Sequence, residues 1–192
     1  MNILKDLKTS LVVTLVLAAV CCGLYPLAVW GGAQLLFKRQ ADGSLLYDKQ
    51  GNLVGSALLG QNFNGAQYFN PRPSAAGAAG YDATSSGGSN LGPTSQKLVD
   101  AVTQRVADYR KANGLPAGAS VPADAVTASA SGLDPHISVE NARLQLARVA
   151  RERKLDPAKL QALVDAHTDR SLLGDDGVNV VTLNLALDGT IE

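Results

Sequence analysis

Asp134, His136 and Ser138 alternate along one short stretch of the chain, and their side chains could support hydrolysis. A hydrolytic triad uses a carboxylate to orient an imidazole, which acts as general base for a hydroxyl nucleophile. In such triads the three groups come from separated segments that fold together. Here Asp134 before Pro135 and Ser138 at a helix start also have structural explanations. We therefore treat an enzyme built on this stretch as the less favoured alternative.

A second candidate is the segment Asp48-Lys49-Gln50-Gly51-Asn52. It is similar to the Asp-Lys-Thr-Gly-Thr phosphorylation loop of P-type pumps but differs at Gln50 and Asn52. The large nucleotide-binding and actuator domains of those pumps are missing from this chain. A Gly-containing turn between two apolar runs is the ordinary signal of a β-hairpin, so we expect a hairpin over residues 44–59.

The composition argues against other kinds of site. The chain has 17 basic and 17 acidic residues, a balance that disfavours nucleic acid as a partner. Both cysteines, Cys21 and Cys22, lie in an apolar run, and His136 and His167 are the two histidines of the chain. These residues do not make a credible zinc set. We expect no catalytic residue, no metal site and no tightly bound cofactor.

The elements that must carry these residues begin with an apolar helix. Residues 9–37 contain no charged side chain. At about 1.5 Å per residue, a helix over this stretch spans the bilayer core of about 30 Å. A cleaved signal peptide has a shorter apolar region, so a retained anchor is favoured. The sequence predicts a short N-terminal tail at 1–8, a transmembrane helix at 9–37 and a soluble domain at 38–192.

Small residues and a proline mark the predicted span. Pro26 removes one helical hydrogen bond, so we expect a kink there. The pairs Ala18-Ala19 and Gly31-Gly32 allow another helix to approach closely. We therefore expect the span to pack against helices of partner chains. Basic residues flank both ends of the span, so charge alone barely indicates its orientation.

The soluble part alternates helical and extended patterns. After the hairpin, residues 60–93 are rich in Gly, Ser, Ala, Asn and Pro and predict a long ordered loop. We expect helices at 94–113, at 139–154 with Ser138 as N-cap, and at 157–167 with Asp156 as N-cap. Strands are expected at 126–128 and 178–187. The predicted fold class is a single N-terminal transmembrane helix plus one α+β soluble domain.

Several separated motifs carry a resemblance to a known family. They are Tyr68-Phe69 with Arg72-Pro73-Ser74, Ser89-Asn90-Leu91-Gly92-Pro93-Thr94-Ser95, Gly132-Leu133-Asp134-Pro135-His136-Ile137-Ser138 with Ala142, Gln145 and Arg148-Val149-Ala150, and Val178-Asn179-Val180 with Leu183-Asn184-Leu185-Ala186-Leu187-Asp188. Together they resemble KdpC, the C chain of the bacterial Kdp potassium-transporting ATPase. The resemblance covers nearly the whole chain in order, including the N-terminal span. One departure is the Gly174-Asp175-Asp176-Gly177 turn before the last expected strand, which is looser than the family's usual approach and leaves the resemblance intact.

The resemblance implies a non-catalytic accessory subunit of a high-affinity, ATP-driven potassium uptake complex. Its implied partners are a channel-like potassium-translocating subunit, a P-type ATPase subunit and a small stabilising peptide. It also implies a catalytic chaperone that supports assembly and raises the ATP affinity of the ATPase subunit. The implied location is the bacterial inner (cell) membrane, with one span and an extracytoplasmic soluble domain. An independent membrane-anchored extracytoplasmic enzyme, or a ligand-binding module, is the alternative.

The resemblance also suggests particular residues. Gln145 is the residue through which ATP would contact this chain, and an exposed polar position on a helix is the simpler explanation for it. Six residues in the family motifs are candidates for contact with a partner subunit: Tyr68, Phe69, Arg72, Asn90, Asp134 and His136.

Overall fold

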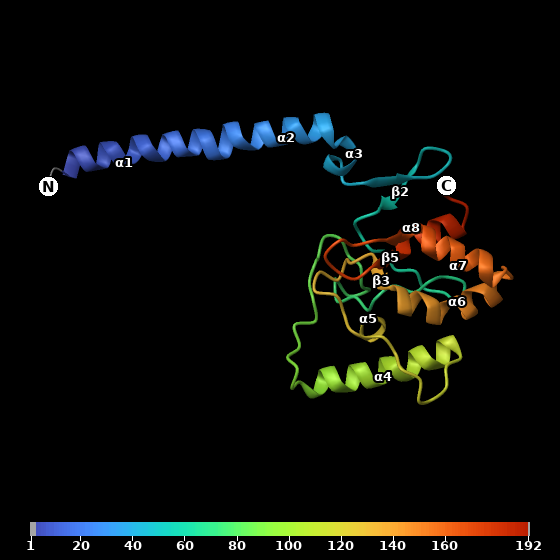
Figure 1. Cartoon of the computed structure of the whole chain (residues 1–192). Coiled ribbons are helices and arrows are strands. Elements are labelled where there is room, and N and C mark those ends of the chain that lie inside the picture. The colour runs from blue at the N-terminus through green and yellow to red at the C-terminus, as the bar shows by residue number, and fades with distance from the viewer. Residues whose placement is uncertain (1–2, 192) are drawn as a thin grey trace. The chain divides into compact units, whose positions relative to one another are not determined.

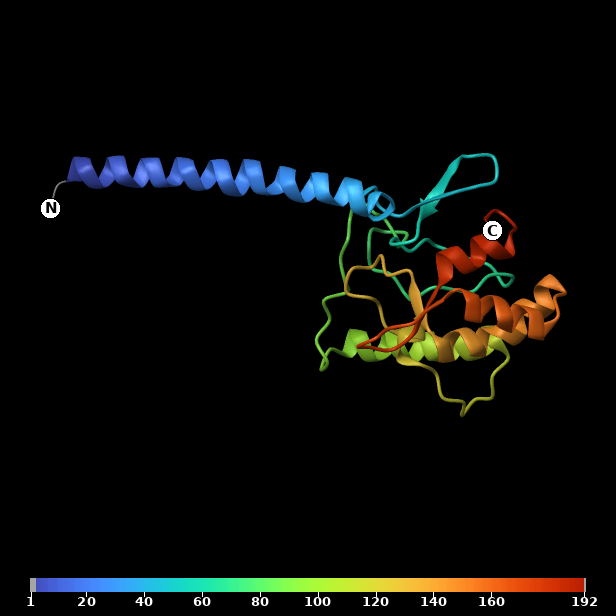
Figure 2. The ribbon, with the colours of Figure 1, turned by 45° about the horizontal axis from the view of Figure 1, so that its top comes forward.

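The computed structural model describes residues 3–191. The chain divides into two compact units, Met1–Leu45 and Leu46–Glu192. Figures 1 and 2 show a long helix in the first unit and several helices with small sheets in the second. The predicted fold class is confirmed: an apolar helix of membrane-spanning length precedes one α+β domain.

The first unit is built on a continuous apolar helix from Ile3 to Leu36, which has the length and composition of a membrane span. It comprises α1 (Ile3–Ala18), a π-helical turn (Ala19–Leu24) and α2 (Tyr25–Leu36). Among the described residues the helix already includes Ile3, so residues 3–8 of the expected tail are helical. No Gly or Pro precedes Thr9 to interrupt the helix. The short helix α3 (Lys38–Ala41) follows Phe37.

Pro26 is accommodated by the π-helical turn. Proline has no N–H and its ring clashes with the carbonyl four residues earlier, so the regular pattern fails at this point. The N–H of Tyr25 donates instead to the carbonyl of Val20, five residues back, as in a π-helix. Figures 1 and 2 show no sharp bend here, so the expected kink is wrong.

The expected hairpin is confirmed as β1 (Leu45–Tyr47) and β2 (Leu53–Ser56). Asp48 organises the turn between them. Its Oδ1 accepts hydrogen bonds from the N–H groups of Gln50 and Asn52, at 2.9 and 2.8 Å. Gly51 follows with a φ of 87°, a left-handed conformation that glycine adopts without strain. The segment that is similar to a phosphorylation loop is therefore a hairpin turn.

A second, three-stranded antiparallel sheet has the order β3-β5-β4. Its strands are β3 (His136–Ser138), β4 (Thr168–Asp169) and β5 (Gly177–Asn179). In the register, His136 pairs with Asn179 and Asp169 pairs with Gly177. The sheet therefore places β3, which begins at His136, beside β5.

The helices of the second unit are α4 (Gln96–Asn113), α5 (Ala123–Val126), α6 (Val139–Arg153), α7 (Pro157–Ala166) and α8 (Val180–Leu187). Ser138 caps α6 by accepting a hydrogen bond from the N–H of Asn141, and Asp156 caps α7 by accepting one from Ala158. Gly114 ends α4 in a left-handed conformation. The helices expected at 94–113, 139–154 and 157–167 are thus confirmed to within two residues at their ends.

The core lies where α6, α7 and α8 meet the three-stranded sheet, and Figure 1 shows these elements side by side. Its buried apolar side chains are Phe69, Ile137, Ala142, Val149, Ala150, Leu160, Val164, Val178, Val180 and Leu183. Phe69 is the member of this set that comes from the long loop. The loop therefore contributes directly to the core.

The two expected strands are wrong in large part. Residues 178–187 form the end of β5 followed by helix α8, which Asn179 caps by accepting a hydrogen bond from Thr182. Val180, Val181, Leu183 and Leu185 are all buried, so α8 is apolar on several sides and lacks the 3.6-residue pattern of a surface helix. Residues 126–128 contain the end of α5 and then irregular chain.

Residues 60–93 contain no helix or strand, as expected. They are ordered by hydrogen bonds to the 131–136 segment and to α6 and α8. The N–H of Gly60 donates to the carbonyl of Leu133 at 2.7 Å, and the N–H of Gly87 donates to Ser131 at 2.9 Å. Because loops need partners for their backbone groups, these contacts explain why a long irregular segment is ordered.

Candidate functional site

Three of the candidate contact residues meet where the long loop lies against the 131–136 segment. Gly132 makes this approach close: it has a φ of 67°, and a Cβ at its position would lie 2.7 Å from the Cβ of Ala76. The hydroxyl of Ser74 donates to the carbonyl of Gly132 at 2.6 Å. Glycine is therefore required at position 132 for both conformation and space.

Arg72 of the loop pairs with Asp134. Its Nη1 lies 3.0 Å from Oδ2 of Asp134, and the side chains are 24% and 30% exposed. The Nε atom of Arg72 is buried and has no hydrogen-bond partner among the described residues. The ion pair between Arg72 and Asp134 joins two motifs that are far apart in the sequence.

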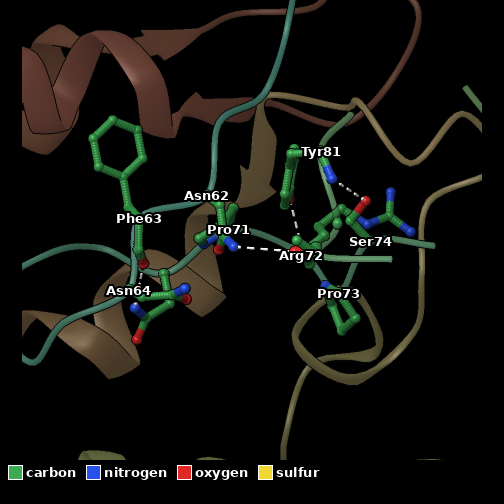
Figure 3. A pocket seen from close by; sticks show the side chains of 11 residues that line it. Asn62, Phe63, Asn64, Pro71, Arg72, Pro73, Ser74 and Tyr81 are labelled. Atoms are coloured by element: carbon green, nitrogen blue, oxygen red, sulfur yellow. Dashed lines mark hydrogen bonds between the residues drawn. The ribbon is translucent and has the colours of Figure 1, made fainter. Parts of the chain in front are cut away.

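The backbone around Arg72 is held by Tyr81. Figure 3 shows the Tyr81 side chain pointing towards Arg72, and its hydroxyl donates to the Arg72 carbonyl at 2.7 Å. The N–H of Tyr81 donates to Oγ of Ser74 at 2.9 Å, which closes the loop around a shallow cavity. Burial raises the pKa of Tyr81, so the hydroxyl stays protonated and remains a donor.

His136 lies between two carboxylates. Its Nε2 is 2.8 Å from Oδ2 of Asp169, and its Nδ1 is 3.6 Å from Oδ1 of Asp134. The nearby Asp134 carboxylate is the main cause of a raised pKa for His136, and burial opposes this rise. The pKa of Asp134 is lowered, chiefly by His136 and also by Arg72. Arg72, Asp134, His136 and Asp169 thus form one chain of alternating charge, which we call the charge chain.

Ser138 is not part of the charge chain. Its hydroxyl donates to Oδ1 of Asp124 at 2.9 Å and accepts the N–H of Asn141 at 3.1 Å, which commits it to capping α6. Among residues 3–191, the partners of both ring nitrogens of His136 are carboxylates rather than a hydroxyl. The structure therefore does not assemble Asp134, His136 and Ser138 as a hydrolytic triad.

The remaining contact candidates lie elsewhere. Tyr68 is half-buried: its hydroxyl donates to Oδ2 of Asp188 at 3.0 Å, and the Arg153 guanidinium lies 4.8 Å from its ring centre. Phe69 is 0% exposed, so its side chain belongs to the core and is not available to a partner, which corrects that expectation. Asn90 is exposed in the loop with a φ of 51°.

Gln145 is 1% exposed, so the expected exposed helix position is wrong. Its Oε1 accepts hydrogen bonds from the N–H of Asn70 at 2.7 Å and from Nη2 of Arg148 at 2.7 Å. Its Nε2 donates to the Asn70 carbonyl at 3.1 Å and to Oδ1 of Asn141 at 2.9 Å. All four hydrogen-bonding positions of the amide are therefore occupied by protein groups.

Arg148 is the centre of this buried network and was not identified as a functional candidate from the sequence. Its Nη1 donates to the carbonyls of Ala66 and Tyr68, and its Nε donates to Oδ1 of Asn113 on α4 at 2.9 Å. The polar residues Asn141, Gln145 and Arg148 share one face of α6, at the helical spacing. Polar residues on the core-facing side of a helix are the signal that could have revealed the network.

Metal-ligating side chains do not gather in the described part of the chain: residues 3–191 contain no group of three or more His, Cys, Asp or Glu side chains placed to hold an ion. What the charge chain offers is a set of hydrogen-bonding and charged groups at a surface.

Comparison with known proteins gives a consistent result. The family model described as "KdpC: K+-transporting ATPase, c chain" matches residues 7–189. The protein named potassium-transporting ATPase KdpC subunit from Mycobacterium tuberculosis is 52% identical over 187 residues, covering 96% of this chain and 98% of the relative. The subunits of that name from Koribacter versatilis and Geobacter sulfurreducens are 49% and 48% identical, covering 97% and 96% of this chain and 95% and 98% of their own lengths.

The match includes most of the apolar helix and nearly all of the domain that carries the charge chain and the Arg148 network. Both the level of identity and the coverage are far above what shared architecture alone would give. This chain therefore belongs to the KdpC family, the c chain of K+-transporting ATPases.

Proposed function

We propose that this chain is a non-catalytic accessory subunit of a high-affinity, ATP-driven potassium uptake complex in the bacterial inner (cell) membrane. The observation that carries the proposal is family membership over residues 7–189, which include most of the apolar helix as well as nearly all of the domain. Its partners in the complex are a channel-like potassium-translocating subunit, a P-type ATPase subunit and a small stabilising peptide. Its role is to support assembly of these chains.

The apolar helix supports this proposal. None of its described residues is buried within this chain, and most of its lateral surface is exposed. Residues 31–34 are partly covered, and Nε2 of Gln34 donates to Oδ1 of Asp42 at 3.1 Å. A Cβ added at Gly31 or Gly32 would have no atom of the described residues within 4 Å. Small residues let neighbouring helices approach closely in a bilayer. The helix is therefore suited to packing against the membrane helices of partner subunits.

The charge chain supplies a surface for the soluble domain to contact a partner. Arg72, Asp134 and His136 are each partly exposed and held in place by one another. We place this domain outside the cytoplasm, next to the channel-like subunit. In that position a contact with the charge chain could order the outer part of the potassium pathway without supplying ligands to the ion.

The effect on ATP affinity is proposed to be indirect. Nucleotide contact at Gln145 would require exchange of the four hydrogen bonds that its amide makes within the protein. An extracytoplasmic domain would also be separated from cytoplasmic ATP by the membrane. Coupling through the helix and the partner subunits requires neither the loss of these hydrogen bonds nor direct contact between ATP and the domain. We therefore propose that the chain raises ATP affinity by stabilising a conformation of the ATPase subunit.

Reconstitution of the complex with and without this chain tests the proposal. The complete complex is expected to hydrolyse ATP in response to potassium. Omission of this chain should abolish that response or raise the ATP concentration needed for half-maximal rate, and the purified chain alone should not hydrolyse ATP. Unchanged ATP dependence in a complex that lacks this chain would refute the proposed role.

A further inference from the structure

The loop between β4 and β5 exposes two adjacent leucines. Leu172 is 97% exposed and Leu173 is 98% exposed. The next most exposed large apolar side chains described in the second unit are Leu58 at 59% and Leu53 at 58%. Single apolar residues on a surface are common, but two neighbouring leucines without any covering atoms are not. We call this feature the leucine tip.

The leucine tip stands on a fixed base. Asp169 of β4 and Gly177 of β5 pair in the antiparallel sheet. Nε2 of His136 lies 2.8 Å from Oδ2 of Asp169, and the N–H of Ser171 donates to Oδ1 of Asp176 at 3.1 Å. The base is therefore joined to β3 and to the charge chain, while the two leucines project from it.

His136 also limits how the base can move. A Cβ added at Gly177 would lie 3.3 Å from Cβ and Cδ2 of His136, so the imidazole packs directly on the backbone of the base. The cavity beside the ring is lined by Asp134, which precedes β3, by Asp169 of β4, and by Arg170 and Asp175 of the loop. These contacts fix the two ends of the loop that carries the leucine tip.

The charges around the leucine tip indicate what covers it. Asp175 and Asp176 lie on its β5 side, while Arg170 and His136 offset Asp169 on the other side. This excess of acidic charge is repelled by an anionic lipid surface. Two copies of the tip would repel each other for the same reason. The complementary occupant is a protein surface with an apolar socket and basic residues around it.

We propose that Leu172 and Leu173 dock into an apolar, basic-rimmed socket on a partner subunit of the potassium transport complex. This inference rests on the proposed function, because it needs a complex for the tip to enter. Docking removes both leucine side chains from water, which is the favourable term, and places Asp175 against the basic rim, which orients the contact. The His136–Asp169 pair holds one end of the loop that carries Leu172 and Leu173.

Photo-cross-linking in the intact complex tests the contact directly. Benzoylphenylalanine replaces Leu173 in the full-length chain, and a matched chain carries it at Val99, which is 50% exposed on α4. Irradiation is expected to join position 173, but not position 99, to a partner subunit. An adduct with a second copy of this chain, an adduct with lipid, or no adduct in an intact complex would overturn the inference.

Substitutions give an independent measurement. The double variant Leu172→Ser and Leu173→Ser should lower recovery of partner subunits with the full chain at least about tenfold, while Val99→Ser should recover them as the wild type does. Asp175→Lys should also lower recovery, whereas docking to anionic lipid predicts stronger attachment. The thermal midpoint of each purified variant in detergent should match the wild type; a lower midpoint for the leucine variant would make the tip structural and overturn the proposal.

The wild-type chain separates the two levels of the argument. If it recovers no partner subunit, the proposed function fails. If it recovers the partners while the double leucine variant recovers them equally well, only the docking of the leucine tip fails.

Discussion

Gln145 of α6 forms two hydrogen bonds with the backbone of Asn70: the Asn70 N–H donates to Oε1 at 2.7 Å, and Nε2 donates to the Asn70 carbonyl at 3.1 Å. Asn184 of α8 holds Phe69 in the same way, at 3.0 and 2.9 Å. Two buried amides from two helices thus bind consecutive residues of the long loop, as a neighbouring strand would. The loop is ordered because its backbone groups find these partners.

Gln145→Ala should destabilise the domain by about 2–3 kcal/mol, because it leaves the backbone of Asn70 without its buried partners. Thermal unfolding of the full chain in detergent, followed by near-ultraviolet circular dichroism, measures this loss. Gln104→Ala, at an exposed position of α4, is the matched control and should change stability little. If Gln145→Ala instead alters the ATP dependence of the complex at an unchanged thermal midpoint, Gln145 contacts nucleotide and the indirect model is wrong.

Arg148→Met should cost about 3 kcal/mol or more, because the carbonyls of Ala66 and Tyr68 and the side chain of Asn113 all lose a buried donor. The long loop should also become sensitive to protease, since Arg148 fixes residues 65–70 to α6. Arg143→Met, on the exposed side of the same helix, is the control. Equal stability and equal protease resistance of the two variants would contradict a structural role for the Arg148 network.

The charge chain predicts a pH dependence with a defined sign. The pKa of His136 is raised in the folded chain, mainly by Asp134. Its contribution to stability is therefore complete below the unfolded pKa of about 6.5 and is lost as the pH rises through the folded pKa. The effect should not exceed about 1 kcal/mol, because the partly exposed pair is screened by solvent.

Comparison of the wild type with His136→Asn isolates this contribution. His167 shifts in the opposite direction, since burial lowers its pKa, but it is present in both chains. In thermal melts from about pH 5.5 to about pH 8.5, the wild type and His136→Asn should differ most in stability near pH 5.5. At that pH the carboxylates are still ionised, because they titrate at lower pH. A difference that grows towards alkaline pH would show that protonated His136 does not hold the charge chain together.

The apolar helix gives a prediction that concerns partners alone. Gly32→Leu adds a side chain at a position where a Cβ has no atom of the described residues within 4 Å, so it should leave the helix and the thermal midpoint intact. If another helix packs on this position, recovery of the partner subunits should fall several-fold. Leu35→Ala, at an 86% exposed position of the same helix, is the control. Wild-type recovery with Gly32→Leu would place the partner helix on another face.

Much of the fold could be predicted from local signals in the sequence. Ser138 and Asp156 revealed two helix starts, and Gly51 revealed the hairpin turn, because caps and turns depend on a few neighbouring residues. Residues 180–187 were assigned wrongly because a helix buried on several sides has no polar face to reveal its period. Helix formation there depends on the Asn179 cap and on tertiary packing.

The candidate site was predictable only as separate pieces. Arg72, Asp134 and His136 were identified as partner-contact candidates, but their pairing depends on a loop whose path is set by buried side chains of α6 and α8. Phe69 and Gln145 were misjudged because burial of a residue in a loop or on a mixed helix face is decided by tertiary contacts. Asp169 was missed because β4 is too short to give a pattern.

The most direct test of the central claim is purification of the full-length chain from its native membrane, with identification of the proteins that accompany it. Membership in a potassium-transporting ATPase complex predicts that a P-type ATPase subunit and a channel-like potassium-translocating subunit elute with this chain in stoichiometric amounts. Elution of the chain alone, under conditions in which those two subunits remain joined to each other, would contradict the account.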